Sequence, residues 1–189
     1  KMYIIAIRIA TALIMYLLLT RLDYDFEEAF RSALFQVVSF ITTTGLSNTD
    51  AGAWPHLTWI ILMVLMFMGA CSGSTTGGFK SIRVLMLLKV LRNEFRHILH
   101  PNAVLPVKLS GQSIPQNRLT TLLAFFTLYI LALLLVATIM IVSGIDITNS
   151  FTIALSLISN VGAGLDTNMG PQMSWADLSD GIKWLCSFL

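Results

Sequence analysis

Two short stretches of similar composition decide the fold of this chain: Thr42-Thr43-Thr44-Gly45-Leu46 and Ser159-Asn160-Val161-Gly162-Ala163-Gly164-Leu165. We refer to residues 42–46 and 159–165 as the first and second glycine stretches. Each has hydroxyl or amide side chains and lies between two apolar segments. Backbone that leaves a helix in an apolar chain must line water or be buried in protein, because lipid offers no hydrogen bonds. Two such interruptions in matching positions indicate a pore-lining ion site built from backbone carbonyls.

The composition is that of an integral membrane protein. Of the 189 residues, 56% are hydrophobic and 12% are charged, and the mean hydropathy is +0.77, whereas soluble domains carry about 25% charged residues. The apolar runs are Tyr3–Leu19, Leu57–Cys71, Leu119–Val142 and Ile182–Leu189. The third run is long enough to cross a bilayer, which takes about 20 helical residues. We therefore expect an all-α integral membrane fold.

Charge is distributed unevenly along the chain. Between residues 80 and 118, Glu94 is the only acid among the basic residues Lys80, Arg83, Lys89, Arg92, Arg96, Lys108 and Arg118. The other connections carry most of the acids. Cytoplasmic loops are enriched in Lys and Arg, so we predict that residues 80–118 are a cytoplasmic linker and that both glycine stretches face outside. Nucleic-acid binding is the weaker explanation for basic residues beside membrane spans.

An internal repeat precedes the two glycine stretches. Phe30-Arg31-Ser32-Ala33-Leu34 and Phe151-Thr152-Ile153-Ala154-Leu155 share the pattern Phe-x-x-Ala-Leu. Asp25 and Asp146 precede the two copies where a helix N-cap falls. The predicted unit is therefore a span, a short re-entrant helix, an exposed loop and a second span, present twice and incomplete in its second copy.

The re-entrant helix predicted at Phe26–Ile41 has a length of about 24 Å, too short for a hydrocarbon core of about 30 Å. Such a helix ends partway through the membrane and directs free carbonyls and a partial negative charge at the pore axis. A dehydrated cation is stabilised there. A surface helix followed by an ordinary loop is the alternative for a single copy, and the repeat favours the pore.

These residues resemble the Trk/Ktr/HKT superfamily of potassium transporters, and within it the bacterial TrkH-type membrane subunits. The matching motifs are Phe35-Gln36-Val37-Val38-Ser39 before the first glycine stretch, Gly73-Ser74-Thr75-Thr76-Gly77-Gly78-Phe79-Lys80, His100-Pro101-Asn102-Ala103-Val104, Ile114-Pro115-Gln116 and Asn160-Val161-Gly162. In that family four span–pore helix–span units surround one potassium pathway with pseudo-fourfold symmetry. The resemblance implies the third unit at 1–79, the linker at 80–118 and the fourth unit at 119–189. The resemblance leaves open whether the first span is complete and implies that the last one is truncated.

The resemblance also implies a role for particular residues. The carbonyl oxygens that bind K⁺ would come from Thr43, Thr44, Gly45, Asn160, Val161 and Gly162. The family's Gly-rich gate loop would comprise Gly73, Ser74, Thr75, Thr76, Gly77 and Gly78. Gly45 and Gly162 suit a carbonyl-lined strand, whose backbone angles a Cβ penalises. Ala163 departs from the family, which often has proline at this place.

The family further implies partners and a location. The missing half of the site would come from an upstream half of the same native polypeptide. A homodimer and a TrkA-like cytoplasmic nucleotide-binding regulatory subunit are expected, in the inner membrane of a bacterial cell. Transported K⁺ is the only ion expected, and no cofactor. No nucleophile–base or metal constellation appears in the sequence, so enzymatic activity has no support.

Two other functions stay open on the sequence alone. The chain could belong to a secondary symporter that couples cation movement to H⁺ or Na⁺, although no acid lies within Leu57–Cys71 or Leu119–Val142. It could also be a membrane scaffold that transports nothing. Its glycines Gly69, Gly73 and Gly77 would then form a small-residue face for helix packing.

Overall fold

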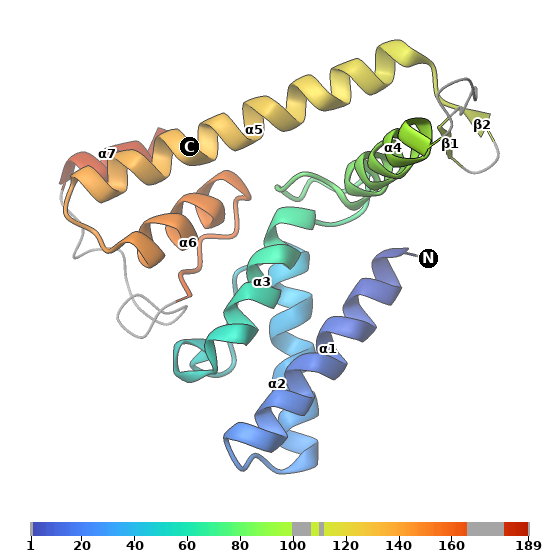
Figure 1. Cartoon of the computed structure of the whole chain (residues 1–189). Helices are drawn as coiled ribbons and strands as arrows, with labels where there is room; N and C mark the ends of the chain where they lie inside the picture. The colour runs from blue at the N-terminus through green and yellow to red at the C-terminus, as the bar shows by residue number, and fades with distance from the viewer. Residues whose placement is uncertain (1, 100–106, 110–111, 166–179, 189) are drawn as a thin grey trace.

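The computed structural model describes residues 2–99, 107–109, 112–165 and 180–188, and they are mostly helical (Figure 1). The helices are α1 (Met2–Arg21), α2 (Phe26–Ile41), α3 (His56–Met68), α4 (Ser81–Leu99), α5 (Gln116–Val142), α6 (Ile147–Ile158) and α7 (Asp180–Phe188), with a 3-10 turn η1 at Ala51–Ala53. Strands β1 (Lys108–Leu109) and β2 (Gln112–Ser113) form a small antiparallel pair with Lys108 opposite Ser113. The motif His100–Val104 lies outside the described residues.

Two of these helices are long and apolar enough to cross a membrane. They are α1, with 20 residues and a hydropathy of 2.2, and α5, with 27 residues and a hydropathy of 2.7. The apolar run Leu57–Cys71 is a shorter helix than its composition suggests, because Gly69 adopts a φ of 59° and α3 ends at Met68. Helix α5 begins at Gln116, three residues inside the predicted linker.

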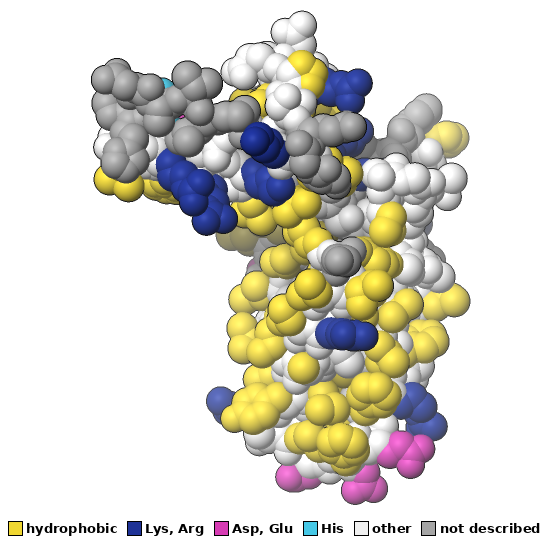
Figure 2. Space-filling view, turned by 90° about the vertical axis from the view of Figure 1, so that its right-hand side faces the viewer, with side chains coloured by type: hydrophobic (Ala, Val, Ile, Leu, Met, Phe, Trp, Pro, Cys, Tyr) yellow, Lys and Arg dark blue, Asp and Glu magenta, His cyan; other side chains and the backbone are white. Residues whose placement is uncertain are grey.

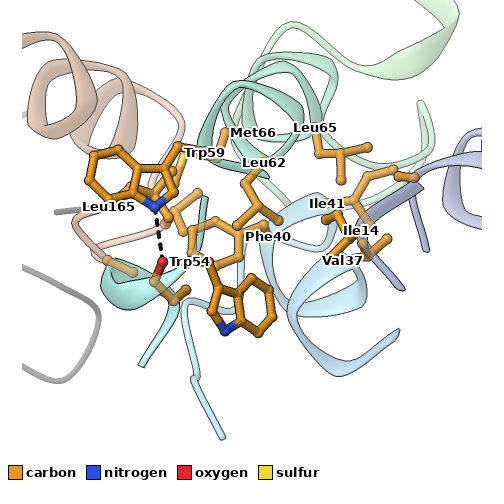
Figure 3. Close-up of a cluster of buried hydrophobic side chains, with 14 of the residues drawn as sticks. Ile14, Val37, Phe40, Ile41, Trp54, Trp59, Leu62, Leu65, Met66 and Leu165 are labelled. Carbon is orange, nitrogen blue, oxygen red and sulfur yellow. Dashed lines mark hydrogen bonds between the residues drawn. The ribbon is translucent and has the colours of Figure 1, made fainter. Parts of the chain in front are cut away.

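The helices pack in two similar groups. Helix α1 lies along α2 and α5 lies along α6, so each long apolar helix carries one short helix (Figure 1). Helix α3 contacts α1, α2 and α6 and thereby joins the two groups. The largest buried cluster lies at this junction, and its fully buried members include Ile14, Val37, Phe40, Leu62 and Leu165 (Figure 3).

A hydrogen bond fixes the turn that enters α3. The indole Nε1 of Trp59 donates to the carbonyl of Ala51 over 2.9 Å inside the buried cluster (Figure 3). Because Ala51 belongs to the turn η1, this bond holds the connection between α2 and α3 against the core. Leu165, at the end of the second glycine stretch, is buried in the same cluster. Both glycine stretches therefore lead into one core.

The charged side chains separate toward the two ends of the molecule. Acidic side chains gather at one end and most basic side chains at the other, with a hydrophobic band between them (Figure 2). The acidic end holds the α1–α2 connection and the start of α2, including Asp23, Asp25, Glu27 and Glu28. The basic end holds α4, whose last turn carries Arg96.

The short helices begin where the sequence predicted. Helix α2 spans Phe26–Ile41, and Asp25 and Asp146 occupy the N-cap positions of α2 and α6. Only Asp146 makes the side-chain bond expected of a cap: one of its carboxylate oxygens accepts from the backbone N–H of Thr148 over 3.1 Å. Asp25 makes no side-chain cap bond. The two starts therefore share a position and differ in how they are stabilised.

Candidate functional site

Helix α2 ends in a cap that sets the path of the first glycine stretch. The N–H of Thr43 donates to the carbonyl of Phe40 over 3.3 Å, and the N–H of Thr44 donates to Ser39 over 2.9 Å. This pair of bonds is a Schellman motif, which requires a left-handed residue after the C-cap. Thr43 takes that conformation with a φ of 54°, although a β-branched residue rarely does so.

Helix α6 ends in the same way. Asn160 donates to the carbonyl of Leu157 and Val161 donates to Ser156, each over 2.9 Å, and Asn160 has a φ of 54°. Asparagine tolerates this region better than other residues. The two caps therefore place Thr43 and Asn160 in equivalent positions at the ends of two different helices.

The two helices nevertheless differ in length. Helix α2 has 16 residues and α6 has 12. Counted from the N-caps, Phe30 corresponds to Phe151, as the repeated sequence suggests. When the two helices are aligned at their C-caps instead, each residue of α2 pairs with a residue of α6 four positions earlier than before. Four residues are about one helical turn. The Phe-x-x-Ala-Leu repeat therefore marks the starts of the two helices and not the ends that carry the glycine stretches.

Most backbone carbonyls of the glycine stretches have no donor among the described residues, and that of Leu46 is an exception because it accepts from Ser39. None of the carbonyl oxygens of the six predicted site residues accepts a hydrogen bond from any residue that the structure describes. These residues are Thr43, Thr44, Gly45, Asn160, Val161 and Gly162. The sequence had also assigned free carbonyls to the helix ends. The Schellman bonds occupy those of Ser39, Phe40, Ser156 and Leu157, whereas the last carbonyl of each helix, at Ile41 and Ile158, has no donor among the described residues. The six free carbonyls of the predicted site belong to residues that come after the two helices in the sequence.

The two glycine stretches lie side by side. A Cβ placed on Gly45 would come within 2.0 Å of the carbonyl oxygen of Val161, so the backbones approach as closely as a glycine allows. Gly45 and Gly162 have φ angles of 73° and 78°, as expected from the penalty that a Cβ meets there. Gly162 differs from Gly45 in having no neighbour within 4 Å of such a Cβ.

Side chains of α2 brace the first glycine stretch. The hydroxyl of Ser39 donates to the carbonyl of Leu46 over 2.5 Å, and the hydroxyls of Thr42 and Thr44 lie 2.8 Å apart. Further along, the Gln36 amide donates to the carbonyl of Thr49 over 3.1 Å. The stretch is thus held mainly by the helix that it follows.

The second glycine stretch is held differently. Its first residue, Ser159, is fully buried, and its hydroxyl lies 2.9 Å from the hydroxyl of Tyr129 in the middle of α5. Ser156, which corresponds to Ser39, has a buried hydroxyl with no partner among the described residues. Ala163 is also buried, so the place where the resemblance favours proline is filled by a small side chain inside the core.

The predicted gate loop lies in a non-helical connection of residues 69–80 between α3 and α4. Two backbone bonds join its ends: Phe79 donates to Phe67 over 2.8 Å and Ser81 donates to Ala70 over 3.0 Å. The alternative of a small-residue helical face is wrong for this segment, because the backbone is not helical. Gly73 has no neighbour within 4 Å of an added Cβ.

The loop touches the second glycine stretch. A Cβ on Gly77 would lie 1.9 Å from the carbonyl oxygen of Ser159. Gly78 has a φ of 76°, and a Cβ there would lie 2.7 Å from the carbonyl oxygen of Met66. The exposed residues Gly73 and Thr75 lie on the open side of the loop. Of the three glycines in the predicted gate, Gly77 is the one whose added Cβ would meet the second glycine stretch.

A lysine bridges the loop from inside. The Lys80 ammonium donates to the carbonyls of Ser74 and Thr76 over 2.5 and 2.6 Å, and Lys80 itself has a φ of 68°. A cation thus already occupies two carbonyls of the loop. Sequence reasoning gave Lys80 no role, although its place at the end of the glycine motif was a usable signal.

The family model described as "Cation transport protein", TrkH, matches residues 8–180. The Trk system potassium uptake protein TrkH of Halomonas elongata is 35% identical over 168 residues, covering 86% of this chain and 33% of that protein. The protein of the same name from Escherichia coli K12 is 35% identical over 149 residues, covering 76% of this chain and 31% of that protein. The chain spans about a third of the length of these curated relatives.

The crystal structure of the potassium transporter TrkH from Vibrio parahaemolyticus superposes with a TM-score of 0.89 at 31% identity, covering 97% of this chain and 39% of that one. The fold and the matched length agree with the resemblance drawn from the glycine motifs. That family is one of cation transport proteins and not of enzymes. The chain belongs to the TrkH family of cation transport proteins.

Proposed function

We propose that this chain forms the third and fourth units of a potassium transport protein, and that K⁺ crosses the membrane at the two glycine stretches. The observation that carries the proposal is the set of six carbonyl oxygens without a described donor, on two stretches that meet at Gly45 and Val161. Free peptide oxygens replace the hydration shell of an alkali cation. The names of the relatives support K⁺ as that cation.

The remaining half of the ion site comes, in this proposal, from an upstream half of the native polypeptide. The relatives are about three times as long as the part that this chain covers. An apolar groove of about 600 Å³ runs along the outer face of α2, lined by Phe30, Leu34, Phe35, Val38 and Leu46 among others. We assign this groove to the upstream units, because it borders the first glycine stretch through Thr42 and Thr44.

The connection 69–80 acts as the gate in this proposal. It reaches the buried end of α6 through Gly77, and its conformation is fixed by backbone bonds and by Lys80. A loop held against the carbonyl stretch obstructs the ion until it moves. We further infer a homodimer, a TrkA-like regulatory subunit on the cytoplasmic side and an inner-membrane location.

Potassium flux tests the proposal directly. The full-length protein in proteoliposomes should carry K⁺ when no H⁺ or Na⁺ gradient is present. Gly45→Asp should abolish this flux, because the carboxylate meets the Val161 carbonyl and blocks the stretch. Flux that requires a coupling gradient would favour a symporter. A folded protein without any flux would favour a scaffold.

The orientation can be tested separately. A cysteine replacing the exposed Ser113 of β2 should resist membrane-impermeant thiol reagents applied outside, since the basic segment is assigned to the cytoplasm. The same substitution at the exposed Asn48, beyond the first glycine stretch, should react quickly. Fast labelling of Ser113→Cys from outside would overturn the topology.

A further inference from the structure

Ser159 lies where the predicted gate and the predicted ion site touch. It is the C-cap of α6 and is fully buried. Its carbonyl oxygen faces Gly77, where a Cβ would come within 1.9 Å. Its hydroxyl lies 2.9 Å from the hydroxyl of Tyr129. One residue is therefore in contact with the connection 69–80 on its backbone side and with α5 on its side-chain side.

Tyr129 also contacts the gate connection. Its ring lies 5.5 Å from the ring of Phe67 and 6.1 Å from that of Phe79, both in edge-to-face geometry. Phe79 is fully buried and stacks on Phe67 at 5.4 Å. Edge-to-face aromatic pairs favour one fixed arrangement of the rings. A displacement of Phe79 therefore moves the ring whose hydroxyl holds Ser159.

The position of Ser159 fixes the carbonyls that follow it. Asn160 is left-handed and Val161 donates back to Ser156, so the path of the second glycine stretch starts from a rigid cap. The carbonyl oxygen of Val161 then lies against Gly45. A shift at Ser159 is thus carried over two residues to the contact between the two stretches.

We propose that Tyr129 and Gly77 are positioning residues for the ion site: they hold Ser159 from two sides and so couple the gate connection to the selectivity of the second glycine stretch. The inference rests on the proposed function. When the connection 69–80 moves, both contacts to Ser159 loosen together. Ion selectivity therefore depends on the state of the gate.

The decisive experiment compares K⁺ and Na⁺ uptake by the full-length protein in proteoliposomes. Tyr129→Phe removes one hydroxyl and keeps the ring in the aromatic cluster. Because a buried hydrogen bond contributes about 0.5–1.5 kcal/mol, we expect the K⁺/Na⁺ uptake ratio to fall about twofold to tenfold. Tyr16→Phe removes a hydroxyl from an exposed tyrosine of α1 and should leave the ratio unchanged.

A double-mutant cycle separates positioning from general loss of stability. Ser159→Ala deletes the other half of the same bond and should shift the ratio by a similar factor. The double variant Tyr129→Phe with Ser159→Ala should shift it no further, because both changes remove one interaction. Additive shifts, or a wild-type ratio in either folded single variant, would overturn the inference.

Gly77→Ala tests the backbone contact. Its Cβ must displace the Ser159 carbonyl, so the ratio should fall, whereas Gly181→Ala has open space around it and should have no effect. If Gly77→Ala does not fold, the Tyr129–Ser159 cycle decides alone. Absence of K⁺ flux in the wild type would instead contradict the proposed function, so the two failures are distinguishable.

Discussion

The first and second glycine stretches have the same backbone geometry but different supports. Thr42 and Ser159 occupy the same C-cap position, and Thr43 and Asn160 share a φ of 54°. Thr42 is partly exposed and bonds to its own helix and to Thr44, whereas Ser159 is fully buried and is held by Tyr129, thirty residues earlier in the chain. The first glycine stretch is thus stabilised by its own helix, and the second is stabilised by another helix, α5.

This difference has a consequence for regulation. A segment braced by its own helix keeps its shape when distant elements move, because none of its supports belongs to them. A segment braced by other elements follows them. The second glycine stretch contacts the connection 69–80 at Gly77, and among the described residues the first stretch has its side-chain bonds within α2 and the turn after it. If the connection 69–80 is the gate, as proposed, the second stretch is the one that responds to its movement.

The two central glycines provide the strongest test of this comparison. Alanine at either Gly45 or Gly162 has to adopt a positive φ, at a cost of about 1–2 kcal/mol. Only at Gly45 does its Cβ also strike the neighbouring stretch. We expect Gly45→Ala to abolish K⁺ uptake and Gly162→Ala to reduce it partly, measured at equal protein density in proteoliposomes. Equal losses would show that the close contact at Val161 is unimportant.

The lysine in the gate connection should have the next largest effect. Lys80→Met removes the ammonium that bonds to the Ser74 and Thr76 carbonyls, and hydrogen bonds to charged groups contribute about 1.5–3 kcal/mol. Basal K⁺ conductance should rise about tenfold or more, since 1.4 kcal/mol corresponds to a factor of ten.

Lys89→Met is the matched control, because Lys89 of α4 also donates to a backbone carbonyl, that of Lys108, but through a solvent-exposed bond. Its conductance should stay at the wild-type level. The Lys80→Met variant should also show a lower K⁺/Na⁺ uptake ratio, because the connection 69–80 contacts the second glycine stretch. An unchanged basal conductance in Lys80→Met would contradict the role of the lysine.

A smaller effect distinguishes the two supports. Thr42→Val removes the bond between the hydroxyls of Thr42 and Thr44 and should lower the K⁺/Na⁺ ratio about twofold to fivefold. Combined with Tyr129→Phe its effect should add, because the two bonds share no partner. Non-additive ratios would mean that the first stretch also depends on α5, and the distinction drawn here would fail.

The smallest effect concerns the starts of the short helices. Asp146 accepts a cap bond from Thr148 and Asp25 makes no side-chain cap bond. Loss of an N-cap bond costs about 1 kcal/mol, so Asp146→Ala should lower the thermal unfolding temperature in detergent clearly more than Asp25→Ala. The reverse order would show that the α6 cap does not stabilise the helix.

The sequence predicted those features that are local in the chain. Phe26–Ile41 was recognised as a helix because an acid precedes it and a hydroxyl-rich stretch follows it, and the structure has these bounds. Gly45 and Gly162 were expected to have backbone angles that a Cβ penalises, and both have a positive φ. The family resemblance placed a loop at residues 73–78, and the backbone is non-helical there.

Other features could not be predicted from local patterns. The left-handed Thr43 is unfavourable for a β-branched residue and is imposed by the Schellman bonds. The Tyr129–Ser159 bond joins residues thirty positions apart, and in an apolar helix such as α5 periodicity does not identify the face that Tyr129 presents. The one-turn difference between the repeats was hidden because Phe-x-x-Ala-Leu matches only at the helix starts.

That one-turn difference makes the two short helices unequal at the entrance of the proposed ion pathway. The stretches after α2 and α6 meet at Gly45 and Val161, and α2 is four residues longer than α6, which is about 6 Å along the helix axis. The first turn of α2 carries Glu27 and Glu28, and the first turn of α6 carries no acid. Under the proposed function, an incoming cation is therefore attracted more strongly by the α2 side of the entrance than by the α6 side.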